Sequence, residues 1–168
     1  IDPDMIAAGG GSAGGHVATA TATLKKLDDP SDDQTISSKP NALLLFNPVY
    51  DNGPDGGWAH DRVKAYWKDI SPAHNIDATT PPAIVFLGEK DSLIPVSTAK
   101  RFQKTMQDAG VKSDLHTYPG QPHGFFNEAK GGKKIFLDTL RKTDAFLVSL
   151  GFLKGEPSEA QLEAALKK

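Results

Sequence analysis

The sequence has no cysteine among its 168 residues. Disulfide bridges, thiolate metal sites and a cysteine nucleophile are therefore excluded, while the compartment in which the protein works stays unknown. Positive charge is not in excess either, because 19 Lys and Arg residues stand against 21 Asp and Glu residues. Without a basic stripe, nucleic acid is not an expected partner.

Long hydrophobic runs are also lacking. No apolar stretch approaches the roughly 18 to 20 residues of a membrane-spanning helix, so no membrane partner is expected. The chain begins at Ile1, directly before an apolar segment. We therefore expect a piece of a longer protein, whose targeting signal would lie outside this sequence. With 38% hydrophobic and 24% charged residues, a single globular domain over 1–168 is predicted.

Short apolar segments alternate with helical patterns along the chain. Strands are predicted at 5–8, 42–46, 83–87 and 113–118. Helices are predicted at 17–26, 97–109 and 134–150, with a last short helix from Ser158. Ser97 is expected to cap the second of these helices and Gly110 to end it. This order predicts an α/β fold of about four mainly parallel strands with helices on both faces.

Residues 47–82 interrupt that rhythm. They contain Asn-Pro, Asn-Gly-Pro, Asp-Gly-Gly and Pro-Pro sequences, with one helical pattern at 60–68. We interpret this segment as an irregular excursion from the sheet and not as a second domain.

The pattern Gly10-x-Ser12-x-Gly14 lies between the first predicted strand and the first predicted helix. That context is typical of a nucleophile elbow, in which small flanking residues permit a sharp turn and the serine hydroxyl projects above the sheet. A glycine-rich phosphate-binding turn is the alternative. The Lys-Ser/Thr ending of a nucleotide-binding loop is absent, and the dinucleotide-binding pattern fits loosely.

A nucleophilic serine needs a base, and the base needs an orienting carboxylate. Asp91 follows the strand 83–87, and His123 follows the strand 113–118. Carboxyl ends of parallel strands meet at one edge of a sheet, so these side chains are expected near Ser12. The order Ser, acid, His is that of α/β-hydrolases. Glu89 is the reserve acid.

The other four histidines compete for the role of base. His16 lies just after the serine and is expected to pack behind the turn, while His116 is in mid-strand. His60 and His74 fall in the excursion. None has metal-ligand spacing with a carboxylate, and no metal or cofactor is predicted, since serine, histidine, aspartate and water complete the chemistry.

Three separated motifs resemble one family. Gly10-Gly11-Ser12-Ala13-Gly14-Gly15-His16, Phe86-Leu87-Gly88-Glu89-Lys90-Asp91 and Gln121-Pro122-His123-Gly124-Phe125 are similar to the C-terminal part of α/β-hydrolase esterases and lipases. The Gly-Ser-Ala-Gly-Gly core resembles acetyl esterases and hormone-sensitive-lipase-like enzymes in particular. The resemblance extends over nearly the whole chain.

The resemblance implies a role for each matched residue. Ser12 would be the nucleophile, His123 the general base and then acid, and Asp91 the orienting carboxylate. The N–H of Ala13 would donate to the oxyanion. The family's second oxyanion donor comes from a loop after the third strand, and no such segment occurs here. The chain is therefore expected to be an N-terminally truncated α/β-hydrolase domain.

Two consequences follow from that truncation. Loss of one oxyanion donor lowers turnover by roughly 100- to 1000-fold in enzymes of this type, so weak activity is expected. The strand Met5–Ala8 would also have an unpaired edge, which predicts a homo-oligomer. The aromatic residues Trp58, Trp67 and Phe125 line a substrate pocket or serve as packing.

The predicted activity is serine-dependent hydrolysis of short-chain, acetyl-like carboxylic esters through an acyl-enzyme. The substrate would be a small-molecule ester, such as an acetylated carbohydrate or small alcohol. A serine peptidase or a thioesterase uses the same triad, so these alternatives stay open. From another functional class, a non-catalytic remnant acting as an assembly module is also considered.

Overall fold

The computed structural model describes residues 2–155, together with residues 160 and 164. The chain divides into two compact units, Ile1–His123 and Gly124–Lys168, and each is described by itself. The helix expected from Ser158 begins outside the described residues.

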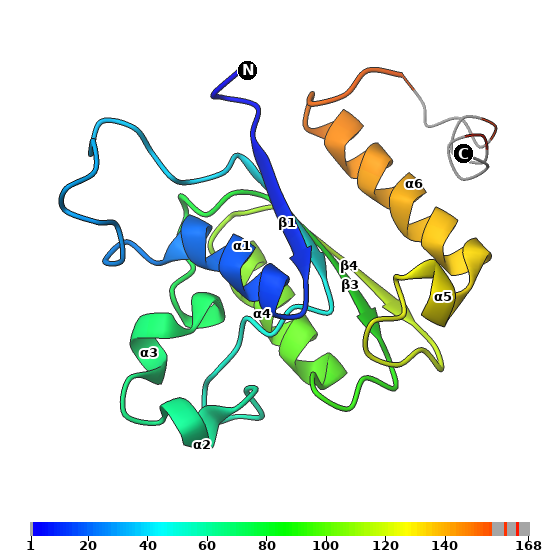
Figure 1. Ribbon diagram of the computed structural model, residues 1–168, viewed down its shortest axis with the longest axis horizontal. Coiled ribbons are helices and arrows are strands. Elements are labelled where there is room, and N and C mark those ends of the chain that lie inside the picture. Colours follow the sequence, from blue (N-terminus) through cyan, green and yellow to red (C-terminus); the bar gives the residue numbers. More distant parts are fainter. Residues whose placement is uncertain (1, 156–159, 161–163, 165–168) are drawn as a thin grey trace. The chain divides into compact units, whose positions relative to one another are not determined.

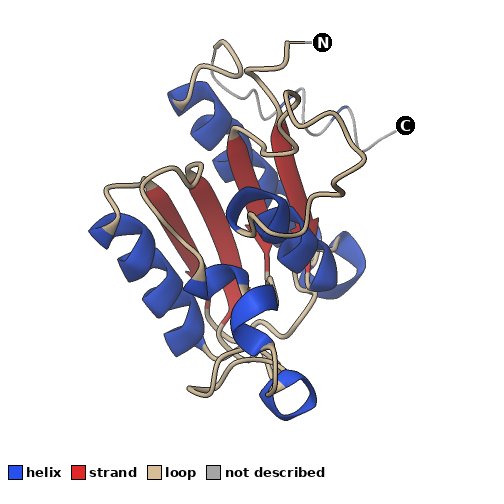
Figure 2. Ribbon diagram, turned by 90° about the vertical axis from the view of Figure 1, so that its left-hand side faces the viewer, coloured by secondary structure: helices blue, strands red, loops and turns tan. Residues whose placement is uncertain are grey.

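The first unit is built around one parallel sheet. Its strands are β1 (Ala7–Gly11), β2 (Ala42–Phe46), β3 (Ala83–Gly88) and β4 (Ser113–Tyr118). They lie in the order β1-β2-β3-β4, and every neighbouring pair is parallel (Figures 1 and 2). All four carboxyl ends therefore lie at one edge of the sheet, and the predicted α/β fold class is confirmed.

Helices connect these strands and form the second unit. The first unit contains α1 (Ala13–Thr23), α2 (His60–Val63), α3 (Trp67–Ile70), a 3₁₀ turn η1 (Pro72–His74) and α4 (Val96–Asp108). The second unit contains α5 (Glu128–Gly131) and α6 (Lys133–Ser149). The pattern expected at 60–68 is thus two separate short helices, α2 and α3.

The start of α4 differs from the sequence expectation. Pro95 occupies the N-cap position with ψ of 142°, and Ser97 lies inside the first turn, so the prediction that Ser97 caps this helix is wrong. An extended proline preceding the first helical residue sets the turn without a side-chain cap. Gly110 follows the helix with φ of 76°, as expected for a residue that ends it.

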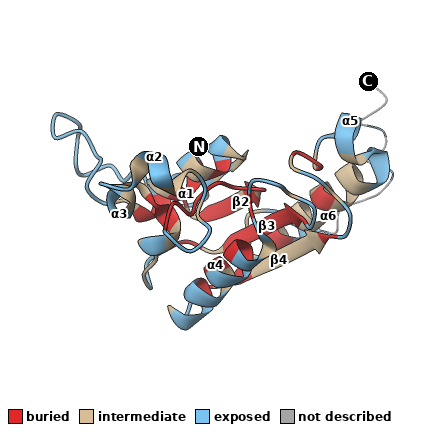
Figure 3. Ribbon diagram, turned by 90° about the horizontal axis from the view of Figure 1, so that it is seen from below, coloured by how far each residue is buried: buried red, intermediate tan, exposed pale blue. Residues whose placement is uncertain are grey.

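The core of the first unit lies between the sheet and the pair α1 and α4. Leu45 of β2, Val85 of β3, Phe102 and Met106 of α4 and Ala22 of α1 belong to one buried cluster. Figure 3 shows β2 and β3 as largely buried and β4 as partly exposed. Burial of each large apolar side chain stabilises the fold by roughly 1.5–3 kcal/mol, which explains the continuous apolar runs of the central strands.

Aromatic rings line the other face of the same strands. Phe86 stacks on Phe46 with 5.0 Å between ring centroids and on His116 with 5.5 Å, and Tyr118 lies 6.4 Å away. His116 therefore lies in mid-strand, as predicted, with its ring stacked on a neighbouring strand.

A buried carboxylate anchors the excursion 47–82 to α4. Asp51 has only 5% of its side chain exposed, and its Oδ2 accepts from Arg101 Nη2 at 3.1 Å. Its Oδ1 accepts from the Gly53 N–H at 2.8 Å and lies 3.8 Å from His74 Nδ1. These contacts fix the segment that follows β2 against the sheet scaffold.

Strand β1 occupies one edge of the sheet and pairs with β2 in the part of the chain that the structure describes. Met5 and Ile6, directly before it, are 38% and 45% exposed. Pairing of this edge with a second copy stays a prediction. Among the described residues, no helix is long and apolar enough to cross a membrane.

Candidate active site

Ser12 sits at a sharp turn between β1 and α1. Its backbone has φ of 54° and ψ of −116°, and α1 begins at the next residue, Ala13. The Ser12 N–H donates to the Phe46 carbonyl at 3.0 Å, and its carbonyl accepts from the N–H groups of His16 and Val49. Such a backbone conformation is strained for a residue with a side chain, and strain of this kind concentrates at functional sites.

The turn depends on a close backbone approach at Gly10. A Cβ atom added there would lie 2.6 Å from the carbonyl carbon of Gly14, a distance that real Cβ atoms essentially never show. Gly15 is equally tight, because its Cβ would lie 2.6 Å from Pro48 Cβ. At Gly14 itself, a Cβ meets nothing within 4 Å in the described structure. Gly10 and Gly15 are therefore tight positions on the two sides of Ser12, and Gly14 contributes only its backbone to the close approach.

This asymmetry gives a matched pair of variants. Gly10→Ala is expected to lower the free energy of unfolding by about 3 kcal/mol, because strand and helix must separate to admit the methyl group. Gly14→Ala is expected to change it by less than about 1 kcal/mol, since alanine is the better helix former and the space is open. Urea denaturation followed by circular dichroism measures both values. Equal destabilisation by the two variants would contradict this description of the turn.

Asp91 and His123 form a hydrogen-bonded pair. Asp91 Oδ2 lies 2.7 Å from His123 Nδ1, and the exposed fractions of the two side chains are 0% and 22% respectively. The other carboxylate oxygen, Oδ1, accepts from the backbone N–H groups of Leu93 at 2.8 Å and Ile94 at 3.1 Å. The aspartate is thus fixed at both oxygens, and it requires His123 to carry its proton on Nδ1.

Gly88 lets the loops that carry this pair approach each other. A Cβ at Gly88 would lie 2.3 Å from the carbonyl oxygen of Gln121. The Lys90 N–H donates to that same oxygen at 2.9 Å, and the Glu89 N–H donates to the Tyr118 carbonyl at 3.0 Å. Sequence reasoning missed this glycine, because its role depends on a contact between loops that are distant in the sequence.

The structure brings a further polar residue, Asn47, to the histidine. Its Nδ2 lies 3.3 Å from His123 Nε2. Among the described residues, no hydrogen bond joins the Ser12 hydroxyl to His123, although both lie at the carboxyl edge of the sheet. Catalytic hydrogen bonds are often long in free enzymes and shorten in the substrate complex. The sequence places an asparagine directly after the buried run 42–46, but its contact with His123 has no local signal.

The remaining histidines have other partners. His16 Nδ1 lies 3.0 Å from the Val49 carbonyl oxygen, which ties its ring to the segment after β2. His74 Nδ1 contacts the Ser71 hydroxyl at 2.9 Å, and His60 Nδ1 lies 2.8 Å from the Asn52 carbonyl oxygen. The reserve acid Glu89 accepts a hydrogen bond from the Thr117 hydroxyl at 2.9 Å. Of the five histidines, His123 is the one whose ring nitrogen contacts Asp91, and its role as the base stays a prediction.

Each of the three predicted pocket residues has its own surroundings. Trp58 is 39% exposed, and its backbone N–H donates to the Asp51 carbonyl at 2.7 Å. Trp67 opens α3 and packs edge-on against His74, with ring centroids 4.7 Å apart. Phe125 belongs to the second unit, where it is buried and packs edge-on against Phe126. A role of these rings in binding substrate stays a prediction.

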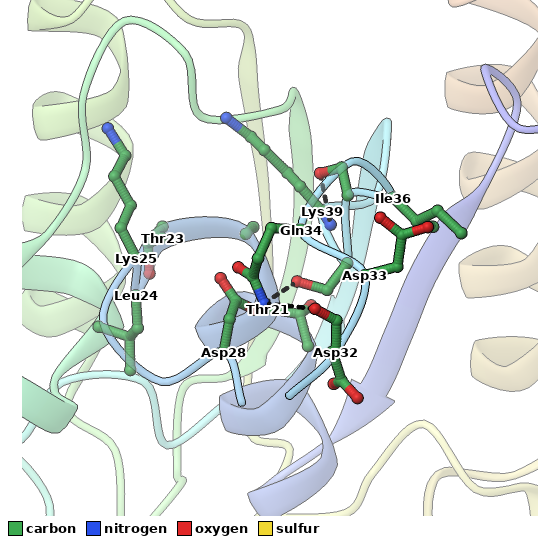
Figure 4. A pocket seen from close by; sticks show the side chains of 13 residues that line it. Thr21, Thr23, Leu24, Lys25, Asp28, Asp32, Asp33, Gln34, Ile36 and Lys39 are labelled. Atoms are coloured by element: carbon green, nitrogen blue, oxygen red, sulfur yellow. Dashed lines mark hydrogen bonds between the residues drawn. The ribbon is translucent and has the colours of Figure 1, made fainter. Parts of the chain in front are cut away.

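A hollow of about 270 Å³ lies at the other end of α1 from Ser12 (Figure 4). The end of α1 and the long loop after it line this hollow, and the lining includes Asp28, Asp32, Asp33, Lys25 and Lys39. Hydrogen bonds from the Thr35 hydroxyl and N–H lower the pKa of Asp33. No group of three or more His, Asp or Glu residues that could hold a metal ion occurs in the described chain.

This architecture, with a strained serine between strand and helix and an Asp–His pair at the same sheet edge, is that of an α/β-hydrolase. More particularly, the chain belongs to the prolyl oligopeptidase family (Peptidase S9), whose model matches residues 1–149. The resemblance to α/β-hydrolase esterases is thereby confirmed.

Curated relatives and solved structures agree with this assignment. The chain is 26% identical over 143 residues to the esterase LipQ of Mycobacterium tuberculosis, covering 74% of this chain and 34% of that protein. It is 29% identical over 137 residues to an acetylxylan esterase of Xylanibacter ruminicola, covering 74% and 27%. It spans about a third or less of these curated relatives.

Esterase 2 of Thermogutta terrifontis is a similar solved structure. Its apo form matches with a TM-score of 0.85 and 40% identity, covering 93% of this chain and 59% of that chain. Its propionate-bound form matches with a TM-score of 0.84 and 39% identity, covering 94% and 60%. At this identity, the described fold corresponds to a part of an esterase.

Proposed function

We propose that this chain carries the catalytic residues of a serine hydrolase that cleaves short-chain carboxylic esters. The observation that carries the proposal is the Asp91–His123 hydrogen bond at the sheet edge that also holds the strained Ser12. Esterases among the relatives favour ester substrates. Propionate- and butyrate-bound forms of the Thermogutta esterase favour short acyl groups.

The proposed first step is acylation of Ser12. His123 Nε2 takes the hydroxyl proton while Ser12 Oγ bonds to the ester carbonyl carbon, and the carbonyl electron pair moves to its oxygen. The Ala13 N–H, in the first turn of α1, has no partner within the helix and donates to that oxyanion. The oxyanion electron pair then re-forms the carbonyl bond, the bond from carbon to the alcohol oxygen breaks, and His123 gives the proton to the leaving alcohol. The acyl group remains on Ser12 Oγ as the acyl-enzyme.

Water completes the cycle by the same route. His123 accepts a proton from water as the water oxygen attacks the acyl carbon. The bond from that carbon to Ser12 Oγ then breaks, His123 returns the proton to Oγ, and the carboxylic acid leaves. Asp91 keeps the ring oriented and stabilises the imidazolium that forms in both steps. The proposed reaction uses these three side chains, the Ala13 N–H, the ester and water.

A serine peptidase is the second candidate, favoured by the description of the matching family as prolyl oligopeptidases. Amide substrates pass through the same tetrahedral intermediate but have a poorer leaving group. The ester proposal rests on the named relatives, which are esterases.

A substrate series separates these candidates. We expect 4-nitrophenyl acetate and butyrate to be hydrolysed at least about tenfold faster than the octanoate, and a blocked prolyl 4-nitroanilide not to be cleaved above the Ser12→Ala background. Nitrophenolate or nitroaniline release at equal substrate concentration gives the rates. Faster cleavage of the anilide would favour the peptidase, and no rate above the variant with any substrate would favour a non-catalytic remnant.

A further inference from the structure

Each of the four strands of the sheet is followed by a polar residue of the site. Ser12 follows β1, Asn47 follows β2, Asp91 lies three residues after β3 and His123 five residues after β4. The proposed mechanism uses Ser12, Asp91 and His123 and gives Asn47 no role. Asn47 nevertheless contacts the histidine at Nε2, the nitrogen that has to take the serine proton.

The backbone of Asn47 is also fixed by its surroundings. The Asn47 residue is 0% exposed, and its N–H donates to the Phe86 carbonyl of β3 at 2.7 Å. Its φ is 36°, so Ser12, Asn47 and Ala59 are the non-glycine residues with positive φ in the described chain. Asparagine tolerates this conformation better than most residues, and Pro48 after it restricts the backbone further.

The chemistry of the two contacts on His123 agrees on one tautomer. An amide NH₂ group only donates hydrogen bonds, so the contact at 3.3 Å requires an unprotonated Nε2. The Asp91 carboxylate only accepts, so the contact at 2.7 Å requires a proton on Nδ1. Both neighbours therefore favour the neutral ring with a free electron pair on Nε2, which is the form that a general base needs.

We propose that Asn47 is a positioning residue for ester hydrolysis, whose side-chain amide holds His123 in the ring orientation and tautomer that accepts the Ser12 proton. The inference rests on the proposed function and adds a fourth residue to its site. The Asn47 amide and the Ser12 hydroxyl are alternative donors to one nitrogen. The hydroxyl displaces the amide when substrate binds, and the amide returns after the proton has left Nε2.

Replacement of Asn47 by aspartate reverses this preference with little change of shape. A carboxylate near Nε2 accepts a hydrogen bond from the protonated ring, so Asn47→Asp is expected to raise the pH at which His123 takes up a proton by about one unit or more. Asn47→Gly keeps the positive φ and removes the amide, and a rise of a few tenths of a unit is expected. Gln107→Glu, on the exposed surface of α4, adds the same charge without contact to His123 and is expected to cause no shift.

Apart from the carboxylate introduced in Asn47→Asp, the charged groups near the His123 ring are the same in all three variants. Asp91 contacts Nδ1 directly, and the neighbouring Glu89 is hydrogen-bonded to Thr117. Lys90, in the same loop, is exposed. A shift specific to Asn47→Asp is therefore attributable to the contact at Nε2.

Titration of the histidine ring protons by NMR, in the Ser12→Ala background, tests the inference without any need for activity. His123→Gln identifies the His123 signal among the five histidines of the sequence. An upward shift in Asn47→Asp with none in Gln107→Glu supports the proposal, even if the chain hydrolyses no ester. An unchanged His123 midpoint in both Asn47→Asp and Asn47→Gly overturns it.

Activity supplies a second readout where the ester hydrolase proposal holds. With Ser12 present, the acid limb of the pH–rate profile is expected to move upward in Asn47→Asp, with kcat about tenfold lower at neutral pH and KM within twofold. A change in KM alone, with the pH profile unmoved, would make Asn47 a substrate contact and contradict the positioning role. If Asn47→Asp does not fold, the Asn47→Gly titration decides.

Discussion

Turnover of an aryl acetate is expected to fall by about 10⁴-fold or more when His123 is replaced by alanine. Without the imidazole, no group accepts the Ser12 proton during attack, and none protonates the leaving alcohol. His16→Ala is the matched control, because the His16 ring is tied to the Val49 carbonyl. That variant is expected to keep kcat/KM within about threefold.

Initial rates of nitrophenolate release, normalised to folded protein by circular dichroism, measure both histidine variants. Loss of activity in His16→Ala with retention in His123→Ala would show that His16, and not His123, is the base. Equal loss in both, with the spectra unchanged, would also contradict the choice of His123.

Replacement of Asp91 by asparagine is expected to lower kcat by about 10⁴-fold at neutral pH, as the corresponding change does in another Ser-His-Asp enzyme. The structure gives the reason in detail. Because the Leu93 and Ile94 N–H groups donate to Oδ1, the asparagine must place its carbonyl oxygen there and turn its NH₂ toward His123. Nδ1 then has to accept, and the ring proton moves to Nε2, where it blocks transfer from Ser12.

Glu89→Gln is the control for that variant. Glu89 is exposed and accepts a hydrogen bond from Thr117, so the amide substitution is expected to change kcat by less than twofold. Steady-state kinetics of the two variants, with Tm values to monitor folding, provide the comparison. A large loss in Glu89→Gln together with a small one in Asp91→Asn would show that the reserve acid is the functional one.

The sheet was predictable because strands that are buried on both faces consist of continuous apolar residues. The continuous apolar runs 42–46 and 83–87 correspond to β2 and β3 within one residue. The strand 113–118 corresponds to β4. The first strand was predicted at 5–8, but β1 is Ala7–Gly11. Its end was missed because consecutive glycines indicate a turn when the sequence is read locally.

The site was predictable only where position along the chain determines position in space. Ser12 follows from its glycine spacing, and Asp91 and His123 follow from the carboxyl ends of successive strands. Gly88 and Asn47 act through contacts with Gln121 and His123 that lie far away in the sequence. No local pattern encodes such contacts, because they arise only when neighbouring strands bring their loops together.

The most direct test of the account is the hydrolysis of 4-nitrophenyl acetate by this 168-residue chain beside its Ser12→Ala variant. The account predicts turnover by the unaltered chain and a fall to the uncatalysed rate in the variant. Equal rates for the two proteins would contradict the proposal that Ser12, His123 and Asp91 form a working catalytic triad in this chain.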